Sequence, residues 1–140
     1  MRAALAMACA LSGMGNGKLS AAATLQISPV VVEMAAGQQA SGILLRNPGA
    51  TPLYGQVRAY AWDQRDGDDL LLATDTLQAS PPIIQVPPQG EQLVRLVRPG
   101  AMSGDAAANE TAYRLIIDEI ADPAAPIVNG VVLRLRYSVP

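Results

Sequence analysis

Apolar and polar residues alternate with a period of two along most of this chain, and turn-forming residues interrupt the alternation at short intervals. In residues 53–63, Val57, Ala59 and Ala61 would share one face of a strand, since successive side chains point to opposite sides. Such alternation is typical of half-buried β-strands, and frequent turns are typical of β-sandwiches. The pattern predicts an all-β fold, a seven-stranded immunoglobulin-like β-sandwich without helices.

The alternation shifts by one residue at Pro29. Leu25 and Ile27 share a face before the proline, and the apolar set afterwards is Val30, Val32 and Met34. Proline inside a strand belongs at an edge or a bulge. A shift of one residue turns the opposite face toward the core. We therefore expect an edge strand that changes sheets after Pro29.

The first residues have the pattern of an export signal. Arg2 is a short positive region, residues 3–11 are apolar but too few to span a bilayer, and small residues at 21–23 suit a cleavage site. We expect residues 1–23 to be a signal peptide. Residues 24–140 would then form one domain of about 117 residues, with no membrane span after the signal is removed.

The composition excludes several kinds of site. The single cysteine, Cys9, lies in the expected signal, and the chain has no histidine. This removes disulfides, thiolate metal sites and nucleophiles based on Cys or His, so we expect neither a metal nor a cofactor. Export without cysteine suits a bacterial periplasm. An enzyme using Asp and Glu stays an alternative, but these residues lie mostly in turns.

The charges argue against nucleic acid as a partner. The chain carries ten Lys and Arg residues against twelve carboxylates. Arg2 and Lys18 fall within the expected signal, so the eight remaining cations are all arginines scattered through an acidic domain. Nucleic-acid binding needs a concentrated excess of positive charge.

The final stretch, residues 127–140, reads IVNGVVLRLRYSVP. A strand this apolar is either a central strand of the sheet or a strand that serves another chain. Its alternating set is either Ile127, Val131 and Leu133, which we prefer, or Val128 and Val132. Gly130 allows a bulge, so the residues alone leave the register open.

Ordered motifs along the chain resemble the amino-terminal domain of the periplasmic pilus-assembly chaperones, nearest the archaic and spore-coat-U-like branch. The resemblance covers nearly all of residues 24–140. The motifs are Leu25-x-Ile27-x-Pro29-x-x-Val32, Gly37-Gln38, Leu45-x-Asn47, Ser80-Pro81-Pro82-Ile83, Gln92-Leu93-Val94-Arg95-Leu96, Glu110 to Leu115 followed by Glu119-Ile120, and Leu135 to Pro140.

The resemblance implies a non-enzymatic chaperone that lends its last strand to pilus or spore-coat-like subunits, a form of β-augmentation called donor-strand complementation. It implies a periplasmic location and an outer-membrane usher as a further partner. The subunit-binding strand would present Ile127, Asn129, Val131 and Leu133. The family also anchors the subunit's terminal carboxylate on two cations, one on the first strand and one on the last. Arg136 best matches the last-strand cation and Arg134 is the second choice.

The chain departs from the family at two points. The first-strand cation should fall near Pro29, which cannot supply a charge. The chain also ends where the first of the family's two domains ends, so we expect the second domain to be absent from it. Either the chain is a fragment or a truncated form, or a second domain is encoded elsewhere. The alternative function is a structural immunoglobulin-like surface or pilus subunit without chaperone activity.

Three smaller expectations concern individual side chains. Arg114 and Glu119 are expected to form a structural pair or surface contacts. Trp62, Tyr54 and Tyr60 are expected to pack on a sandwich face. Ser80-Pro81-Pro82 is expected to shape a loop, with a cis bond before Pro82.

Overall fold

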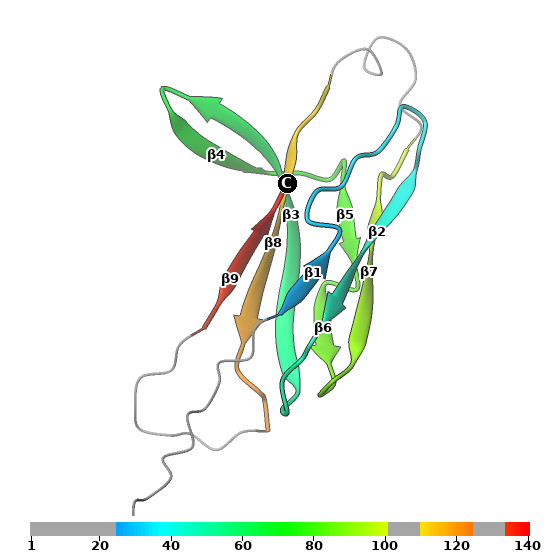
Figure 1. Ribbon diagram of the computed structural model, residues 1–140. Helices are drawn as coiled ribbons and strands as arrows, with labels where there is room; N and C mark the ends of the chain where they lie inside the picture. The colour runs from blue at the N-terminus through cyan, green and yellow to red at the C-terminus, as the bar shows by residue number, and fades with distance from the viewer. Residues whose placement is uncertain (1–24, 101–109, 125–133) are drawn as a thin grey trace, which may run out of the picture.

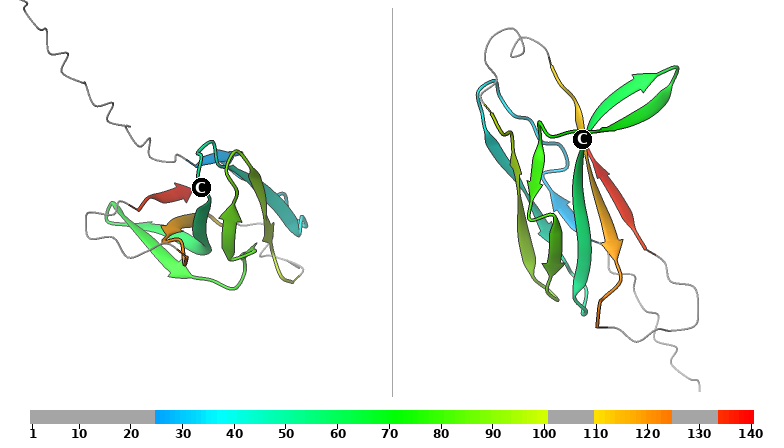
Figure 2. Two further views of the ribbon diagram at one scale, coloured as in Figure 1. Left: turned by 90° about the horizontal axis from the view of Figure 1, so that it is seen from below. Right: turned by 180° about the vertical axis from the view of Figure 1, so that it is seen from behind.

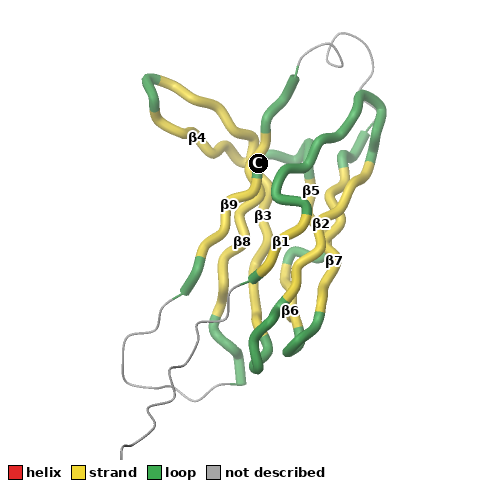
Figure 3. The backbone as a smooth tube through the Cα atoms, in the orientation of Figure 1, coloured by secondary structure: helices red, strands yellow, loops and turns green. Residues whose placement is uncertain are grey.

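The computed structural model describes residues 25–100, 110–124 and 134–140, and these residues form two antiparallel sheets packed face to face (Figure 1). Strands and loops make up the whole described part, which contains no helix (Figure 3). The strands are β1 (Gln26–Ser28), β2 (Ala40–Arg46), β3 (Leu53–Arg65), β4 (Asp68–Ala73), β5 (Gln78–Ser80), β6 (Ile83–Val86), β7 (Glu91–Val97), β8 (Tyr113–Ile120) and β9 (Arg136–Val139).

The predicted immunoglobulin-like sandwich is confirmed, but the described residues contain nine strands rather than seven. One sheet has the order β1-β2-β7-β5. In the other the order is β4-β3-β8-β9, and β6 also pairs with β3. The additional strands arise because the chain changes sheets between β5 and β6, where the sequence suggested only a loop. The cis bond in this connection precedes Pro81, so the expectation of a cis bond before Pro82 is wrong; a second cis bond precedes Pro29.

The core lies between the sheets and follows the alternation of the sequence. Ile43 and Leu45 of β2 face Val57 of β3 across the interior, and all three are almost completely buried. Burying each such side chain contributes about 1.5–3 kcal/mol relative to leaving it exposed. The remaining members of the core are Leu25, Leu53, Leu77, Ile84, Val86, Val94, Leu96, Leu115, Ile117 and Val139.

The first strand changes sheets as predicted from Pro29. Ile27 pairs with Leu45 of β2 in one sheet. After Pro29 the backbone N–H of Val32 donates to the carbonyl of Pro140, at the end of β9 in the other sheet, over 3.2 Å. Val32 and Met34 pack against the core, whereas Val30 stays exposed and does not join it. The shift of parity thus correctly marked the crossing.

The tip of β3 and all of β4 form a hairpin that projects from the body of the sandwich (Figure 1; Figure 2, right). Asp66 and Gly67 connect the strands with φ angles of 54° and 88°. Positive φ at both central residues matches the twist of the flanking strands, and Asp-Gly is a favoured pair for such turns. The acidic segment 63–69 is therefore an exposed hairpin end.

A buried asparagine joins the loops at the other end of the sandwich. The side chain of Asn47 is completely buried. Its Nδ2 lies 2.8–3.2 Å from the carbonyl oxygens of Thr51, Val86 and Pro87, and its Oδ1 accepts from the N–H of Gly49. Buried polar groups need such partners, so Asn47 fixes the paths of two loops at once.

Candidate functional site

One edge of β9 is open along most of its length. β9 pairs with β8 on one side, and no described strand pairs with its other side, which forms the margin of the sheet in Figure 1 and Figure 2 (right). The N–H of Glu119 donates to the carbonyl of Leu135. The main-chain N–H and C=O groups of successive residues point to alternate sides of a strand. Those of Leu135, Tyr137 and Val139 therefore point toward β8, and those of Arg136 and Ser138 point toward the open side.

The open edge ends at Pro140. The carbonyl of Pro140 points to the same side as those of Arg136 and Ser138, and it accepts from Val32. The segment after Pro29 therefore covers the end of this edge. Arg136 and Ser138, both exposed, are left with N–H and C=O groups that can pair with an additional strand.

Three strands are tied together on the outer face beside this edge by one carboxylate. Asp118 of β8 accepts from Nε of Arg136 of β9 through Oδ1 and from Nη2 of Arg58 of β3 through Oδ2, each over 2.5 Å. Hydrogen bonding to Arg136 holds the pKa of Asp118 below its usual range. Partial burial opposes this lowering of the pKa, and the bond from Arg58 adds to it.

Both arginines of the sequence prediction are described: Arg136 begins β9, and Arg134 lies just before this strand. Arg136 lies directly opposite Asp118 in the register of β8 and β9. Arg134 is two residues earlier and exposed. The predicted subunit-binding residues Ile127, Asn129, Val131 and Leu133 lie outside the described residues.

Stacked cations and aromatic rings continue along the outer face of β3 and β8. The guanidinium of Arg114 lies 4.1 Å from the centre of the Trp62 ring, and that of Arg58 lies 5.8 Å from the centre of the Tyr60 ring. The predicted packing of these aromatic residues on a sandwich face is confirmed. Arg114 and Glu119 were expected to form a structural pair or surface contacts. The pair is wrong, because residues five apart on a strand point to opposite faces, and each residue makes its own separate contact. A side-chain oxygen of Glu119 instead accepts from the N–H of Leu135.

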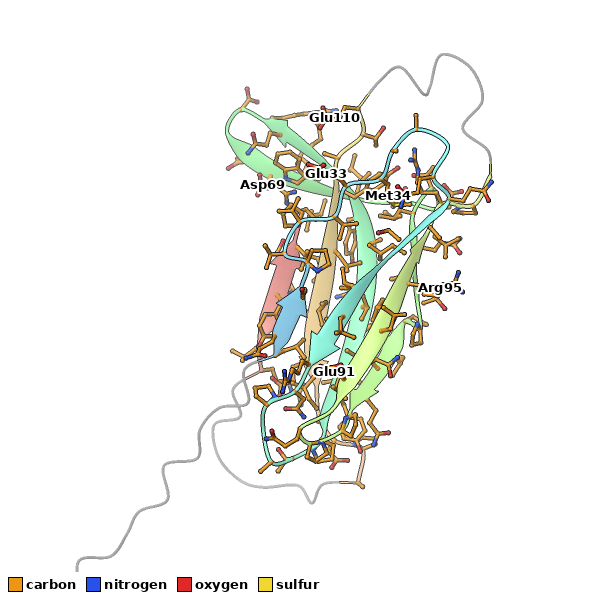
Figure 4. The ribbon with its side chains drawn as sticks, turned by 45° about the vertical axis from the view of Figure 1, so that its right-hand side comes forward. Glu33, Met34, Asp69, Glu91, Arg95 and Glu110 are labelled. Carbon is orange, nitrogen blue, oxygen red and sulfur yellow. The ribbon has the colours of Figure 1, made fainter. Side chains whose placement is uncertain are left out.

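A cavity of about 620 Å³ opens between the sheets at the end where β9 stops. Val32, Leu96 and Val139 supply apolar walls, and Glu33, Met34 and Glu110 lie around it, at the upper end of Figure 4. The cavity thus has apolar walls and charged residues of both signs in its lining, since Arg98 and Arg114 line it as well.

The described part of the chain offers neither a metal site nor a membrane-spanning helix. Its carboxylates do not gather in groups of three or more that could hold a metal ion. It also contains no helix of the length and apolarity that crossing a membrane requires.

The fold and the open edge agree with the family that the chain matches. Residues 24–140 match the family described as pili and flagellar-assembly chaperone, PapD N-terminal domain. The chain belongs to this family of pilus-assembly chaperones. No match was found among curated proteins.

Solved structures place the chain near the archaic branch, as the sequence motifs predicted. The CsuC–CsuE chaperone–tip adhesion subunit pre-assembly complex from the archaic chaperone-usher Csu pili of Acinetobacter baumannii is 27% identical, with a TM-score of 0.69 over 84% of this chain and 50% of that chain. Two further solved structures share the fold. One is the Salmonella enterica SafA pilin in complex with the SafB chaperone, with 18% identity and a TM-score of 0.62 over 85% of this chain and 53% of that chain. The other is the E. coli chaperone DraB, with 18% identity and a TM-score of 0.60 over 84% of this chain and 52% of that chain. The chain spans about half the length of these proteins.

Sequence reasoning overlooked Asp118 and Asn47 as organising residues. Asp118 directly follows the three buried apolar residues of β8, so a carboxylate at the end of this apolar run was an available signal. Asn47 stood in the motif Leu45-x-Asn47, but nothing in the sequence alone marks an asparagine before Pro-Gly as buried.

Proposed function

We propose that this chain is the strand-lending domain of a periplasmic pilus-assembly chaperone, which binds incomplete pilus or spore-coat-like subunits through its last strand. The observation that carries the proposal is the open edge of β9, with the outward main-chain groups of Arg136 and Ser138. Pairing a subunit strand there would satisfy these groups. It would also cover an edge that otherwise invites aggregation.

The apolar contacts would come from the segment before β9. If the alternation of β9 continues backward without a bulge, Ile127, Asn129, Val131 and Leu133 fall on the side of Leu135 and Tyr137. This side includes Ile127, Val131 and Leu133, the alternating set expected from the sequence. Side chains from alternate positions of a lent strand fill pockets of the receiving protein and give specificity.

The carboxylate anchor would be Arg136, assisted by Arg134 on the same face. A guanidinium stays charged and binds a carboxylate through two parallel hydrogen bonds. The Arg136 side chain is 67% exposed beside the open edge, so a terminal carboxylate of a paired strand can reach it. Pro29 contributes no charge, and the anchor therefore rests on the last strand.

The cellular setting follows from the same proposal. Residues 1–23 would direct export and be removed, and the domain would act in the periplasm without catalysing a reaction. The usher of the outer membrane would receive the loaded complex. The alternative of a structural subunit has no observation in its favour, whereas the family match and the open edge both favour the chaperone.

Co-expression of the full chain with the secreted β-rich protein encoded beside it, followed by pull-down, tests strand lending. We expect Val131→Asp or Ile127→Asp to abolish capture, because a charge would enter an apolar pocket. Leu93→Asp is the matched control, since Leu93 is 53% exposed on β7 of the other sheet. Capture that survives both substitutions in the last strand would refute the proposal.

A further inference from the structure

Asp118 uses both of its oxygens to hold cations from the two neighbouring strands. Its Oδ1 accepts from Arg136 and its Oδ2 from Arg58, and its side chain is 17% exposed. Asp118 and Arg136 are a directly opposed pair that exchanges no main-chain hydrogen bonds, the kind in which side chains lie closest. The carboxylate is therefore fixed by two charge-assisted contacts rather than by one.

Arg136 keeps most of its hydrogen-bonding capacity. A guanidinium has five N–H donors, and Asp118 takes the one on Nε. The two Nη groups make no hydrogen bond to a described residue, and the side chain is largely exposed. Two arginines around one carboxylate leave an excess of one positive charge, and Arg134 adds another nearby.

We propose that Asp118 is a positioning residue for the carboxylate anchor, holding Arg136 by its Nε edge so that the paired Nη groups face a carboxylate of the bound chain. The inference rests on the proposed function, because it needs Arg136 to receive that carboxylate. It adds the residue that orients the anchor and the edge of the guanidinium that binds. It also assigns the residue that stabilises Arg136 to β8. The first-strand position near Pro29 offers no charge.

Two effects of Asp118 on an incoming carboxylate oppose each other, and they make the inference testable. Its own negative charge repels the ligand, so removing it would tighten binding if repulsion dominated. Binding a ligand normally costs the conformational entropy of the side chain that it immobilises. A side chain that is already ordered avoids this cost, which changes the dissociation constant about two- to tenfold per side chain. Because both oxygens of Asp118 already contact cations, its charge is compensated locally and the ordering effect is the larger.

The binding test uses the full chain and two synthetic peptides of the sequence acetyl-Thr-Val-Thr-Val-Thr, one with a free carboxylate and one amidated. NMR titration of the arginine Nε–H signals gives the ratio of their dissociation constants. We expect the intact chain to prefer the free acid and Asp118→Ala to reduce that preference about two- to tenfold. Asp118→Asn, which keeps an acceptor of the same size, should restore part of it. An unchanged or increased preference in Asp118→Ala would overturn the inference.

Two further variants separate this inference from the proposed function. Arg136→Ala should abolish the preference for the free acid, and if it does not, the carboxylate anchor itself is refuted. Arg95→Ala is the control, because Arg95 points away from the sandwich on the other sheet (Figure 4). If Arg136→Ala loses the preference for the free acid and Asp118→Ala does not, the anchor stands and the positioning role of Asp118 is rejected.

A measurement without ligand keeps the test independent of peptide affinity. Nitrogen-15 relaxation of the arginine Nε sites reports side-chain motion on the picosecond to nanosecond scale. We expect Arg136 to be clearly more rigid than Arg95 in the intact chain, and as mobile as Arg95 in Asp118→Ala. Equal mobility of Arg136 and Arg95 in the intact chain would contradict the inference.

Discussion

The backbone N–H of Leu25 donates to the hydroxyl of Tyr137 over 3.1 Å, which joins residues 112 positions apart in the sequence. Leu25 precedes β1 in one sheet and Tyr137 belongs to β9 in the other. Tyr137 also packs against the core. This bond therefore ties the two sheets at the side of the sandwich where β9 leaves an open edge.

Replacing Tyr137 with Phe should loosen this side of the sandwich. The substitution keeps the ring but removes the acceptor for Leu25, and one such hydrogen bond contributes about 1 kcal/mol. Urea unfolding should show this loss, and the amide protons of β9 should exchange faster with solvent. Tyr54→Phe is the control, since its hydroxyl accepts from the exposed Gln85. Equal stability of Tyr137→Phe and the parent chain would contradict the assignment.

The bonds of Asp118 predict a loss of stability in acid. A carboxyl whose pKa is lowered by folding stabilises the folded state at pH values above its unfolded pKa, near 3.8, and this stabilisation disappears as the pH falls through the folded pKa. Asp118→Asn should therefore be less stable than the parent at pH 7, by about 1 kcal/mol. The difference should vanish below the folded pKa.

Urea unfolding of both proteins from pH 7 down to pH 2 measures this dependence. Glu91→Gln serves for comparison, because its carboxylate lies 4.0 Å from Arg46 on the exposed surface and should matter little. A difference between Asp118→Asn and the parent that persists unchanged at the acid end would argue against the ionic origin.

The stacking of Arg114 on Trp62 predicts an optical signal. Trp62 is the single tryptophan of the chain, so its fluorescence reports this contact alone. Arg114→Ala should expose the ring, shift its emission to longer wavelength and lower the unfolding free energy by about 0.5–1 kcal/mol. Arg65→Ala, in the exposed hairpin tip, should change neither quantity. Unaltered emission in Arg114→Ala would mean that the stack does not persist in solution.

Asn47 predicts the largest loss of stability among these positions. Asn47→Ala leaves buried carbonyl oxygens without a donor, which costs about 1–3 kcal/mol. Asn47→Asp should lower the stability at least as much, because a carboxylate oxygen would then face the carbonyl oxygens that Nδ2 contacts. Thermal or urea unfolding measures both, with the exposed Gln26→Ala as the control. A loss no greater than that of Gln26→Ala would show that water replaces the asparagine.

Local pattern predicted the sandwich well because side-chain alternation depends only on neighbours in sequence. A period of two placed Val57, Ala59 and Ala61 on one face, and Val57 is a core residue. Pro29 marked the crossing because a one-residue shift can only mean a change of face. The strand count was wrong for a related reason. β5 is three residues long, too short for alternation to distinguish from a loop.

The arrangement around the candidate site depends on pairings that no local pattern contains. Asp118 meets Arg136 and Arg58 because β8 lies between β9 and β3 in one particular register. A shift of β8 by one residue would move Asp118 to the other face, away from both arginines. The resemblance to the chaperone family singled out Arg136 as the expected last-strand cation, but its partner 18 residues away could come only from the register.

The contact between Val32 and Pro140 also has a consequence for the order in which the domain would fold if it is exported. If the chain crosses a membrane amino terminus first, Val32 reaches the far side long before Pro140. Its hydrogen bond to Pro140 can form only after Pro140 has crossed. Contacts of such long separation form late, because a large loop must close first. If the open edge of β9 pairs with a subunit strand as proposed, that edge would become defined only when Pro140 has reached Val32, and this contact would set the earliest time of strand pairing.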